Sequence, residues 1–180
     1  MYLILMWLSF ATALLAGFYY YMATTDGLNA FLHPFVMLLI IGSAVLIPRT
    51  GKRVSYFQRY TQGLNAILLS VTLIVLIVHI ATLIFHMGYA IDLLLIVPVS
   101  VGAVFMVMGN YLQRFKLPND VSYSRVWNQK LRPFARIFVI GGAMMIMTVF
   151  FPAMMMLFFV ILTVVISVLV TSLFSGIKSA

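Results

Sequence analysis

The charged residues of this sequence divide it into five long stretches that contain no Asp, Glu, Lys or Arg. The stretches are residues 1–25, 27–48, 60–91, 93–113 and 137–177. A helix needs about 20 consecutive apolar residues to cross the hydrocarbon core of a bilayer, so each of the first four stretches can hold one crossing. The fifth has 41 residues, and a single helix of that length would be roughly twice as long as the core is thick. Because Pro152 near its middle interrupts helix formation, we expect a helical hairpin that turns at residues 151–153.

The composition excludes a water-soluble protein. Hydrophobic residues make up 64% of the chain and charged residues 8%, with a mean hydropathy of +1.16. Soluble domains carry about 25% charged residues, and disordered chains combine low hydrophobicity with high charge. We therefore expect an all-α fold, a polytopic membrane helical bundle that forms a single transmembrane domain over residues 1–180. Its six transmembrane helices are predicted at about residues 3–23, 29–47, 64–86, 92–112, 135–151 and 154–175.

The basic residues determine the expected orientation of this bundle. The chain has eleven Lys and Arg against three acidic residues, for a formal net charge of +8. With six crossings and both termini in the cytoplasm, all eleven basic residues fall on the cytoplasmic side, in agreement with the positive-inside rule. In a soluble protein this charge would suggest nucleic-acid binding. Here the orientation accounts for it, and we expect no nucleic-acid partner.

Ionisable side chains within or beside the spans are the candidates for a ligand site, because placing them in a bilayer is costly. Five of them lie toward the outer side of the predicted bundle: Asp26, His33, His79, His86 and Asp92. His86 follows His79 by two helical turns on the same face. Together the five could form a carboxylate–imidazole cluster that binds a ligand, a metal ion or a proton. The alternative is that they cap helix ends and form hydrogen bonds between helices. Their spacing matches no chelating motif, so we expect no resident metal ion and no cofactor.

The connection over residues 114–136 is the most basic part of the chain. It holds six of the eleven basic residues together with aromatic side chains such as Trp127. Clustered Lys and Arg attract anionic lipids, and Trp favours the headgroup region. We therefore expect this loop to contact the lipid bilayer through anionic lipids, with a cytosolic protein regulator as the alternative partner.

No catalytic pattern is present in the sequence. The GxSxG, HExxH, Walker and GxGxxG patterns are all missing, and the chain contains neither Cys nor Glu. We expect that the protein is not an enzyme.

Three segments resemble signature sequences of the SdpI immunity family. Residues 108–119, MGNYLQRFKLPN, resemble the family's GN-Y-(x)-K-x-PN signature, in which the end of a helix leads into a basic inner loop. Residues 126–128, VWN, resemble the family's VW segment that leads into the next helix. Residues 48–60, with a proline–basic pair and paired aromatics, are similar to another loop of the family. The resemblance covers roughly residues 40–145, and six helices with both termini inside are also similar to that family.

Two departures separate this chain from the family pattern. The GIRTPWTL block that normally lies between the PN and VW segments is absent, because only residues 120–125 intervene. The threonine and histidine that follow the tryptophan are replaced by Gln129 and Leu131. If the missing block contacts a partner, partner binding is altered in this chain.

The resemblance implies a bacterial plasma-membrane protein that protects against a membrane-active peptide toxin. Some members of the family also hold a cytosolic transcriptional repressor at the membrane. The motif residues carried over by position are Asn110, Asn119 and Trp127. We expect the two asparagines to cap the helix and order the loop, and the tryptophan to anchor the loop at the interface. Two other functions stay open from the residues alone: a small transporter or ion-handling protein, and a structural subunit of a membrane complex.

Overall fold

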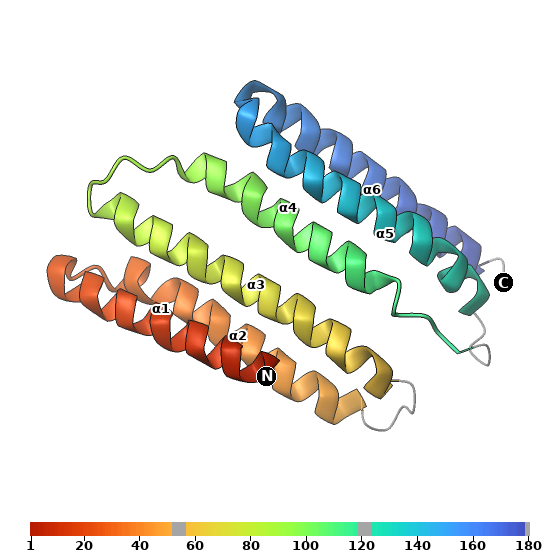
Figure 1. Ribbon diagram of the computed structural model, residues 1–180, viewed down its shortest axis with the longest axis horizontal. Helices are drawn as coiled ribbons and strands as arrows, with labels where there is room; N and C mark the ends of the chain where they lie inside the picture. The colour runs from red at the N-terminus through yellow and green to blue at the C-terminus, as the bar shows by residue number, and fades with distance from the viewer. Residues whose placement is uncertain (52–56, 119–123, 179–180) are drawn as a thin grey trace. The chain divides into compact units, whose positions relative to one another are not determined.

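The computed structural model of the chain describes residues 1–51, 57–118 and 124–178, and over these residues it contains six α-helices (Figure 1). The expected all-α class is confirmed. Two short 3-10 helices, η1 (Thr148–Phe150) and η2 (Pro152–Met154), stand between the last two α-helices. The α-helices are α1 (Tyr2–Thr24), α2 (Gly27–Gly51), α3 (Phe57–His86), α4 (Leu93–Leu112), α5 (Ser124–Met147) and α6 (Met155–Lys178).

Helices α1 to α5 are each long and apolar enough to cross a membrane. Many of their large apolar side chains point outward: Ile4, Leu15 and Met22 of α1 are 72%, 73% and 85% exposed. Small residues such as Ala13 and Gly17 are buried instead. A water-soluble bundle would bury its large apolar side chains, whereas lipid solvates them and leaves the helix contacts to small residues. The chain therefore has the construction of a multi-pass membrane protein.

Helix α5 begins well before the span predicted at residues 135–151. It starts at Ser124 and includes Pro133. The prediction began the span near the last basic residue of the loop, because charges are excluded from the hydrocarbon core. The structure instead continues the helix through these charges, which is possible because Arg125 and Arg132, seven residues apart, lie on one helical face. The first turns of α5 are thus a basic amphipathic extension of an apolar helix.

The break predicted at residues 151–153 is present. Helix α5 ends at Met147, and Phe151 leaves the helical conformation with φ −135° and ψ 69°. Proline at position 152 cannot donate the hydrogen bond that would continue the preceding helix. Helices α5 and α6 are therefore two separate helices joined by η1 and η2.

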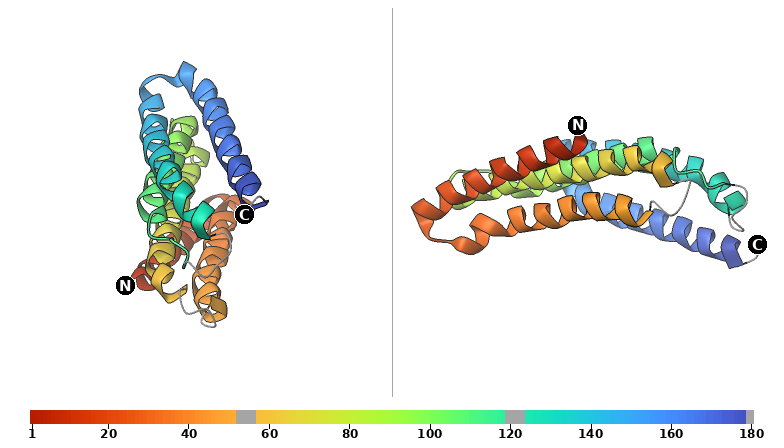
Figure 2. Two further views of the ribbon diagram at one scale, coloured as in Figure 1. Left: turned by 90° about the vertical axis from the view of Figure 1, so that its right-hand side faces the viewer. Right: turned by 90° about the horizontal axis from the view of Figure 1, so that it is seen from below.

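The chain divides into two compact units, Met1–Ile96 and Val97–Ala180. In the first unit α1, α2 and α3 each contact the other two. Helices α1 and α2 form a hairpin with a tight turn (Figures 1 and 2). At this turn Thr25 adopts φ 59°, and its N–H donates to the carbonyl oxygen of Tyr21 at 2.8 Å.

In the second unit, glycines bring α4 and α5 into close antiparallel contact. A Cβ atom at Gly102 would approach the carbonyl oxygen of Gly142 to 2.5 Å, and one at Gly109 would approach that of Ala135 to 2.6 Å. Between these two contacts the rings of Phe105 and Phe138 meet edge to face, with centroids 5.2 Å apart. Residue numbers rise along α4 from Gly102 to Gly109 while those of their partners on α5 fall from Gly142 to Ala135, so the contacts define one antiparallel register. Glycine at these positions permits the close backbone approach on which helix packing in a membrane depends.

Candidate functional site

Two histidines meet inside the first unit. His79 of α3 is 0% exposed, and His33 of α2 is partly buried. Their ring centroids lie 5.4 Å apart and their planes are tilted by 48°. Ionisable side chains inside apolar helices are costly to place in a membrane, so these two rings are candidates for a functional site.

A hydrogen bond to α1 defines the tautomer of His79. Its Nε2 atom lies 3.1 Å from the backbone carbonyl oxygen of Ala13. A carbonyl oxygen only accepts, so Nε2 carries the hydrogen and donates it. In the neutral ring the Nδ1 atom then bears a lone pair, which can accept a hydrogen bond or a proton.

The residues around the histidines explain how the rings are brought together. A Cβ atom at Gly17 of α1 would overlap the carbonyl oxygen of Ala30 on α2, so only glycine permits this approach of the two helices. Pro34 is buried next to His33, and it has no N–H to donate to the carbonyl of Ala30 one turn earlier. The proline thus leaves the Ala30 carbonyl available for the close contact with Gly17. This contact places His33 beside His79.

Both rings retain polar nitrogen atoms without a partner. The Nδ1 atoms of His33 and His79 are buried and make no hydrogen bond within the described part of the chain. Buried polar groups of this kind are rare and need an explanation. The arrangement can accept or share a proton, or hold a small polar species between the rings. No third His, Asp or Glu joins the two rings among the residues that the structure describes.

Asp26 is placed at the start of α2 and caps that helix. One carboxylate oxygen accepts the backbone N–H of Asn29 at 3.2 Å, and the other accepts the Asn29 side-chain amide at 2.6 Å. This is the arrangement of an N-cap residue. The Asn29 side-chain bond, followed by the backbone bond, holds the pKa of Asp26 below its ordinary value, with a smaller contribution from the charge of His86.

His86 and Asp92 are both exposed at the connection between α3 and α4. The Nδ1 atom of His86 lies 2.9 Å from the carbonyl oxygen of Thr82 within the same helix. Asp92 accepts the N–H of Leu94 at 2.9 Å and so caps α4. The five outward residues therefore do not gather into one group: the structure pairs His33 with His79, and it uses Asp26 and Asp92 as helix caps.

The second unit contains a clasp, by which we mean the hydrogen bonds of Trp127 and Asn128 to the chain that follows α4. The indole Nε1–H of Trp127 donates to the carbonyl oxygen of Phe115 at 2.7 Å. The Asn128 side chain accepts the N–H of Leu117 at 2.8 Å and donates to the carbonyl oxygen of the same residue at 2.9 Å. The backbone N–H and the backbone carbonyl of Leu117 are thus both satisfied by one amide side chain. The clasp joins the first turn of α5 to the segment that leaves α4.

The motif asparagines have different places. Asn110 is exposed inside α4, two residues before the helix ends at Leu112. Asn119 lies outside the described residues. The residue that orders the loop is Asn128, which sequence reasoning placed beside Trp127 without assigning it a role. A side chain that bonds to the backbone of a distant segment leaves no spacing pattern in the sequence, so no signal identified it.

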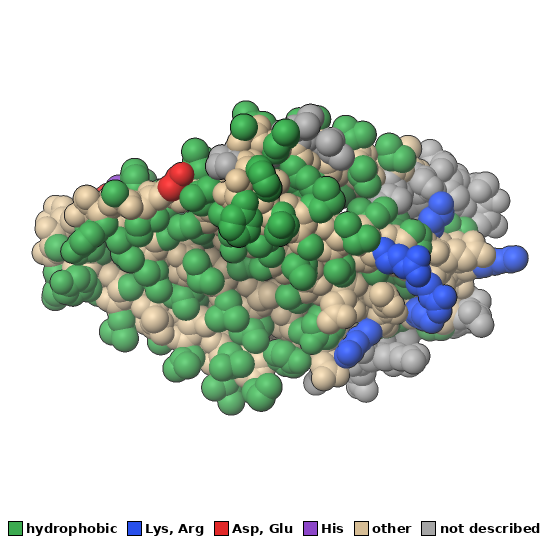
Figure 3. Space-filling model, turned by 45° about the horizontal axis from the view of Figure 1, so that its top comes forward, with side chains coloured by type: hydrophobic (Ala, Val, Ile, Leu, Met, Phe, Trp, Pro, Cys, Tyr) green, Lys and Arg blue, Asp and Glu red, His purple; other side chains and the backbone are tan. Residues whose placement is uncertain are grey.

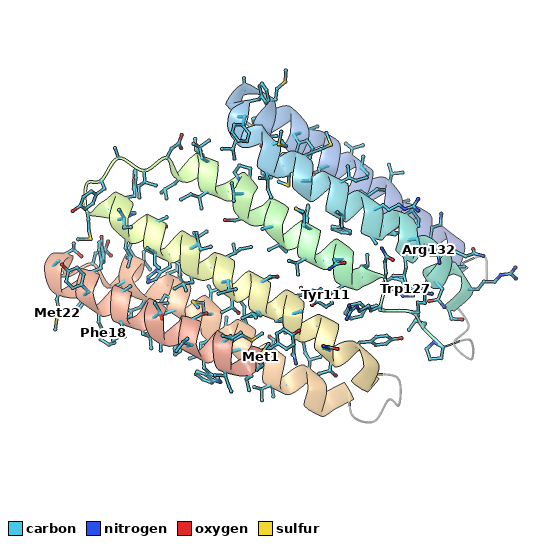
Figure 4. All side chains as sticks on the ribbon, viewed as in Figure 1. Met1, Phe18, Met22, Tyr111, Trp127 and Arg132 are labelled. Carbon is cyan, nitrogen blue, oxygen red and sulfur yellow. The ribbon has the colours of Figure 1, made fainter. Side chains whose placement is uncertain are left out.

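A basic hollow lies beside the clasp. It has a volume of about 670 Å³, and its lining residues are Lys116, Ser124, Arg125, Asn128, Gln129 and Arg132. In the space-filling view the Lys and Arg side chains gather at the α4–α5 end of the second unit (Figure 3). Tyr111, Trp127 and Arg132 mark this end among the side chains (Figure 4). The guanidinium of Arg114 lies 5.0 Å from the centre of the Tyr111 ring, in a cation–π contact.

The chain matches no protein-family model, and comparisons with curated proteins and with solved structures found no significant similarity.

Proposed function

We propose that this chain is a non-enzymatic immunity or receptor-like protein of the bacterial cell membrane, similar in role to the SdpI family. In this role it would protect the cell against a membrane-active peptide toxin and could signal through its basic cytoplasmic loops. Six crossings with both termini in the cytoplasm suit this role. The distribution of the eleven basic residues supports that orientation.

The clasp is the observation that carries the proposal. The resemblance rests on two separate stretches, residues 108–119 and 126–128. Three hydrogen bonds connect them, two from Asn128 to Leu117 and one from Trp127 to Phe115. Trp127 is the motif residue among the bonding side chains, and its indole bond to Phe115 links the two stretches that carry the resemblance. The clasp also gives the basic loop a defined shape, which a cytosolic regulator could recognise.

The peptide would bind at the outer end of the first unit. Asp26 and Asp92 present carboxylates there, one before α2 and one before α4. Together these two acidic side chains would attract a cationic peptide, and the exposed apolar side chains near this end, such as Tyr89 and Met22, would contact its apolar face. A peptide can bind to this surface although Asp26 and Asp92 lie apart and do not form one cluster with the histidines.

Survival of toxin-sensitive bacteria tests the proposal. Cells that express the chain are exposed to an SDP-type peptide toxin, and membrane abundance is measured in parallel. We expect the chain to protect. The variant Trp127→Phe removes the indole donor but keeps an aromatic ring, and Asn128→Leu removes both bonds to Leu117. Both variants should lower protection at unchanged abundance.

The second tryptophan of the chain supplies the matched control. Trp7 is exposed on α1, where its ring packs edge to face on Phe10. Trp7→Phe should therefore leave protection unchanged. Absence of protection by the unmodified chain at confirmed abundance would overturn the immunity proposal.

A second candidate function is favoured by the buried imidazole pair. A small ion-handling protein could move protons through His33 and His79, whose Nδ1 atoms are buried without partners in the described structure. Proton uptake into proteoliposomes under a pH gradient tests this function. Uptake that survives His79→Phe as well as it survives His86→Ala would exclude a path through the pair.

A further inference from the structure

The basic hollow beside the clasp has the composition of an anion site. Its cations come from two segments: Lys116 follows α4, while Arg125 and Arg132 belong to α5. Ser124, Asn128 and Gln129 add neutral hydrogen-bonding groups. The lining residues that the structure describes include no carboxylate. An anion that enters the hollow therefore meets positive charge from more than one side.

The helix geometry directs the two arginines to the same place. Arg125, Gln129 and Arg132 are separated by four and three residues, so they occupy one face of α5. Guanidinium groups bind phosphate oxygens through paired N–H donors, which makes arginine the preferred residue for phosphate recognition.

The start of α5 strengthens the positive potential of the hollow. Ser124 is the first residue of this helix, and it is buried where it lines the hollow. The first N–H groups of a helix have no partner within the helix, and the helix dipole is positive at this end. A helix start alone binds nothing specifically, but here it coincides with three cations around an open hollow of about 670 Å³.

The opposite face of α5 indicates the depth at which the hollow lies. Trp127, Phe134 and Phe138 are on that face, where they line a separate apolar space of about 220 Å³. Of these, Trp127 is of the residue type that is enriched at the boundary between headgroups and hydrocarbon. The hollow on the other face of the same turns is therefore level with lipid phosphates.

We propose that Lys116, Arg125 and Arg132 form a binding site for a phosphate group, in the hollow at the start of α5. The ligand is a phosphate ester or phosphate diester with one or two negative charges. Its source is either the headgroup of an anionic phospholipid or a soluble phosphate compound. The proposal is independent of toxin protection, because it depends only on the charges and shape of this hollow.

Native mass spectrometry of the full-length chain in detergent micelles tests the site. Phosphatidylglycerol and phosphatidylcholine with identical acyl chains are titrated separately, and bound lipid is counted. We expect phosphatidylglycerol to bind more tightly. The double variant R125Q/R132Q should weaken its binding by at least about 10-fold, since the loss of even one hydrogen bond to a charged group has an effect of that size. Circular dichroism checks that the variant keeps its helices.

Arg114→Gln provides the matched control, because it removes one positive charge at the same end of the unit from a residue that does not line the hollow. It should leave the binding of phosphatidylglycerol within about 2-fold.

Displacement of the lipid by inorganic phosphate at millimolar concentration would support the site and assign it a soluble ligand. Retention of the lipid in the presence of phosphate would support the site and assign it a lipid headgroup. Equal binding of the two lipids without any phosphate binding, or equal losses in Arg114→Gln and R125Q/R132Q, would overturn the proposal.

Discussion

Gly102 of α4 and Gly142 of α5 face each other so closely that a methyl group on either residue would overlap the backbone carbonyl of the other. The contact is reciprocal, and Gly109 repeats it two turns further along α4 against Ala135. Helices in a membrane gain little from hydrophobic burial, because lipid is as apolar as their side chains. Backbone contact at these glycines is therefore a main source of α4–α5 affinity.

Gly102→Ala and Gly142→Ala should each destabilise the second unit by about 1–3 kcal/mol, because the added methyl group forces the two helices apart. Unfolding by SDS in mixed micelles measures the effect. Gly42 of α2 is the control, since a Cβ atom there meets no other atom within 4 Å. Gly42→Ala should be neutral or slightly stabilising. Equal losses in all three variants would contradict the close contact.

His79→Ala should destabilise the first unit by about 2–4 kcal/mol, because it removes the hydrogen bond to Ala13 and leaves a cavity among three helices. His79→Phe preserves most of the volume and should lose only about 1 kcal/mol. The exposed His86 gives the control, and His86→Ala should change stability by less than about 0.5 kcal/mol. A nitrogen NMR spectrum in which His79 carries its hydrogen on Nδ1 would contradict the bond to Ala13.

Loss of the clasp should expose the basic loop to protease. In Asn128→Leu both bonds to Leu117 are removed, so the segment between α4 and α5 should open more often and trypsin should cleave after Lys116 or Arg125 several-fold faster. Trypsin digestion followed by mass spectrometry of the fragments measures the rate. Trp7→Phe should digest at the rate of the unmodified chain. An unchanged rate in Asn128→Leu would mean that the clasp does not hold the loop in solution.

The carboxyl of Asp26 should titrate below the ordinary range of aspartate. Its bonds from Asn29 favour the charged form, which lowers the pKa. The stabilisation that they give to the start of α2 is complete above the ordinary pKa of an aspartate, and it is lost as the pH falls through the lowered pKa. Asn29→Ala removes the side-chain bond and should raise the pKa of Asp26 toward its ordinary value. Carbon NMR of the carboxyl group during an acid titration measures both values, with Asn110→Ala as a control that leaves the pKa unchanged.

The sequence predicts most of the helices because lipid imposes long apolar runs. The ends of α1 and α4 lie within a residue or two of their predicted positions. The start of α5 could not be found in this way. Its first turns are basic, and a rule that ends a span at a charge cannot distinguish a loop from an amphipathic helix. Arg125 and Arg132 reveal the helix only through their shared face.

The pairing of histidines was beyond the sequence for a different reason. Helical periodicity relates His79 to His86 within one helix, but it carries no information on which residue of a neighbouring helix lies opposite. The neighbour is selected by the approach of Gly17 to Ala30, which brings His33 to His79. Small residues at several places in α1 and α2 could have made such a contact, so the register between helices had to come from the structure.

The bonds of Asn128 to Leu117 close a ring in the backbone between two positions eleven residues apart. A loop whose two ends are held together by hydrogen bonds can change its length without disturbing the helices on either side. The entropy of closing a flexible loop rises only slowly with length, by about 0.6 kcal/mol for each doubling. A block of residues inserted between positions 119 and 125 would fall inside this ring. Gain or loss of such a block could therefore change what the loop touches while α4 and α5 stay as they are, and the same place would accept an inserted tag.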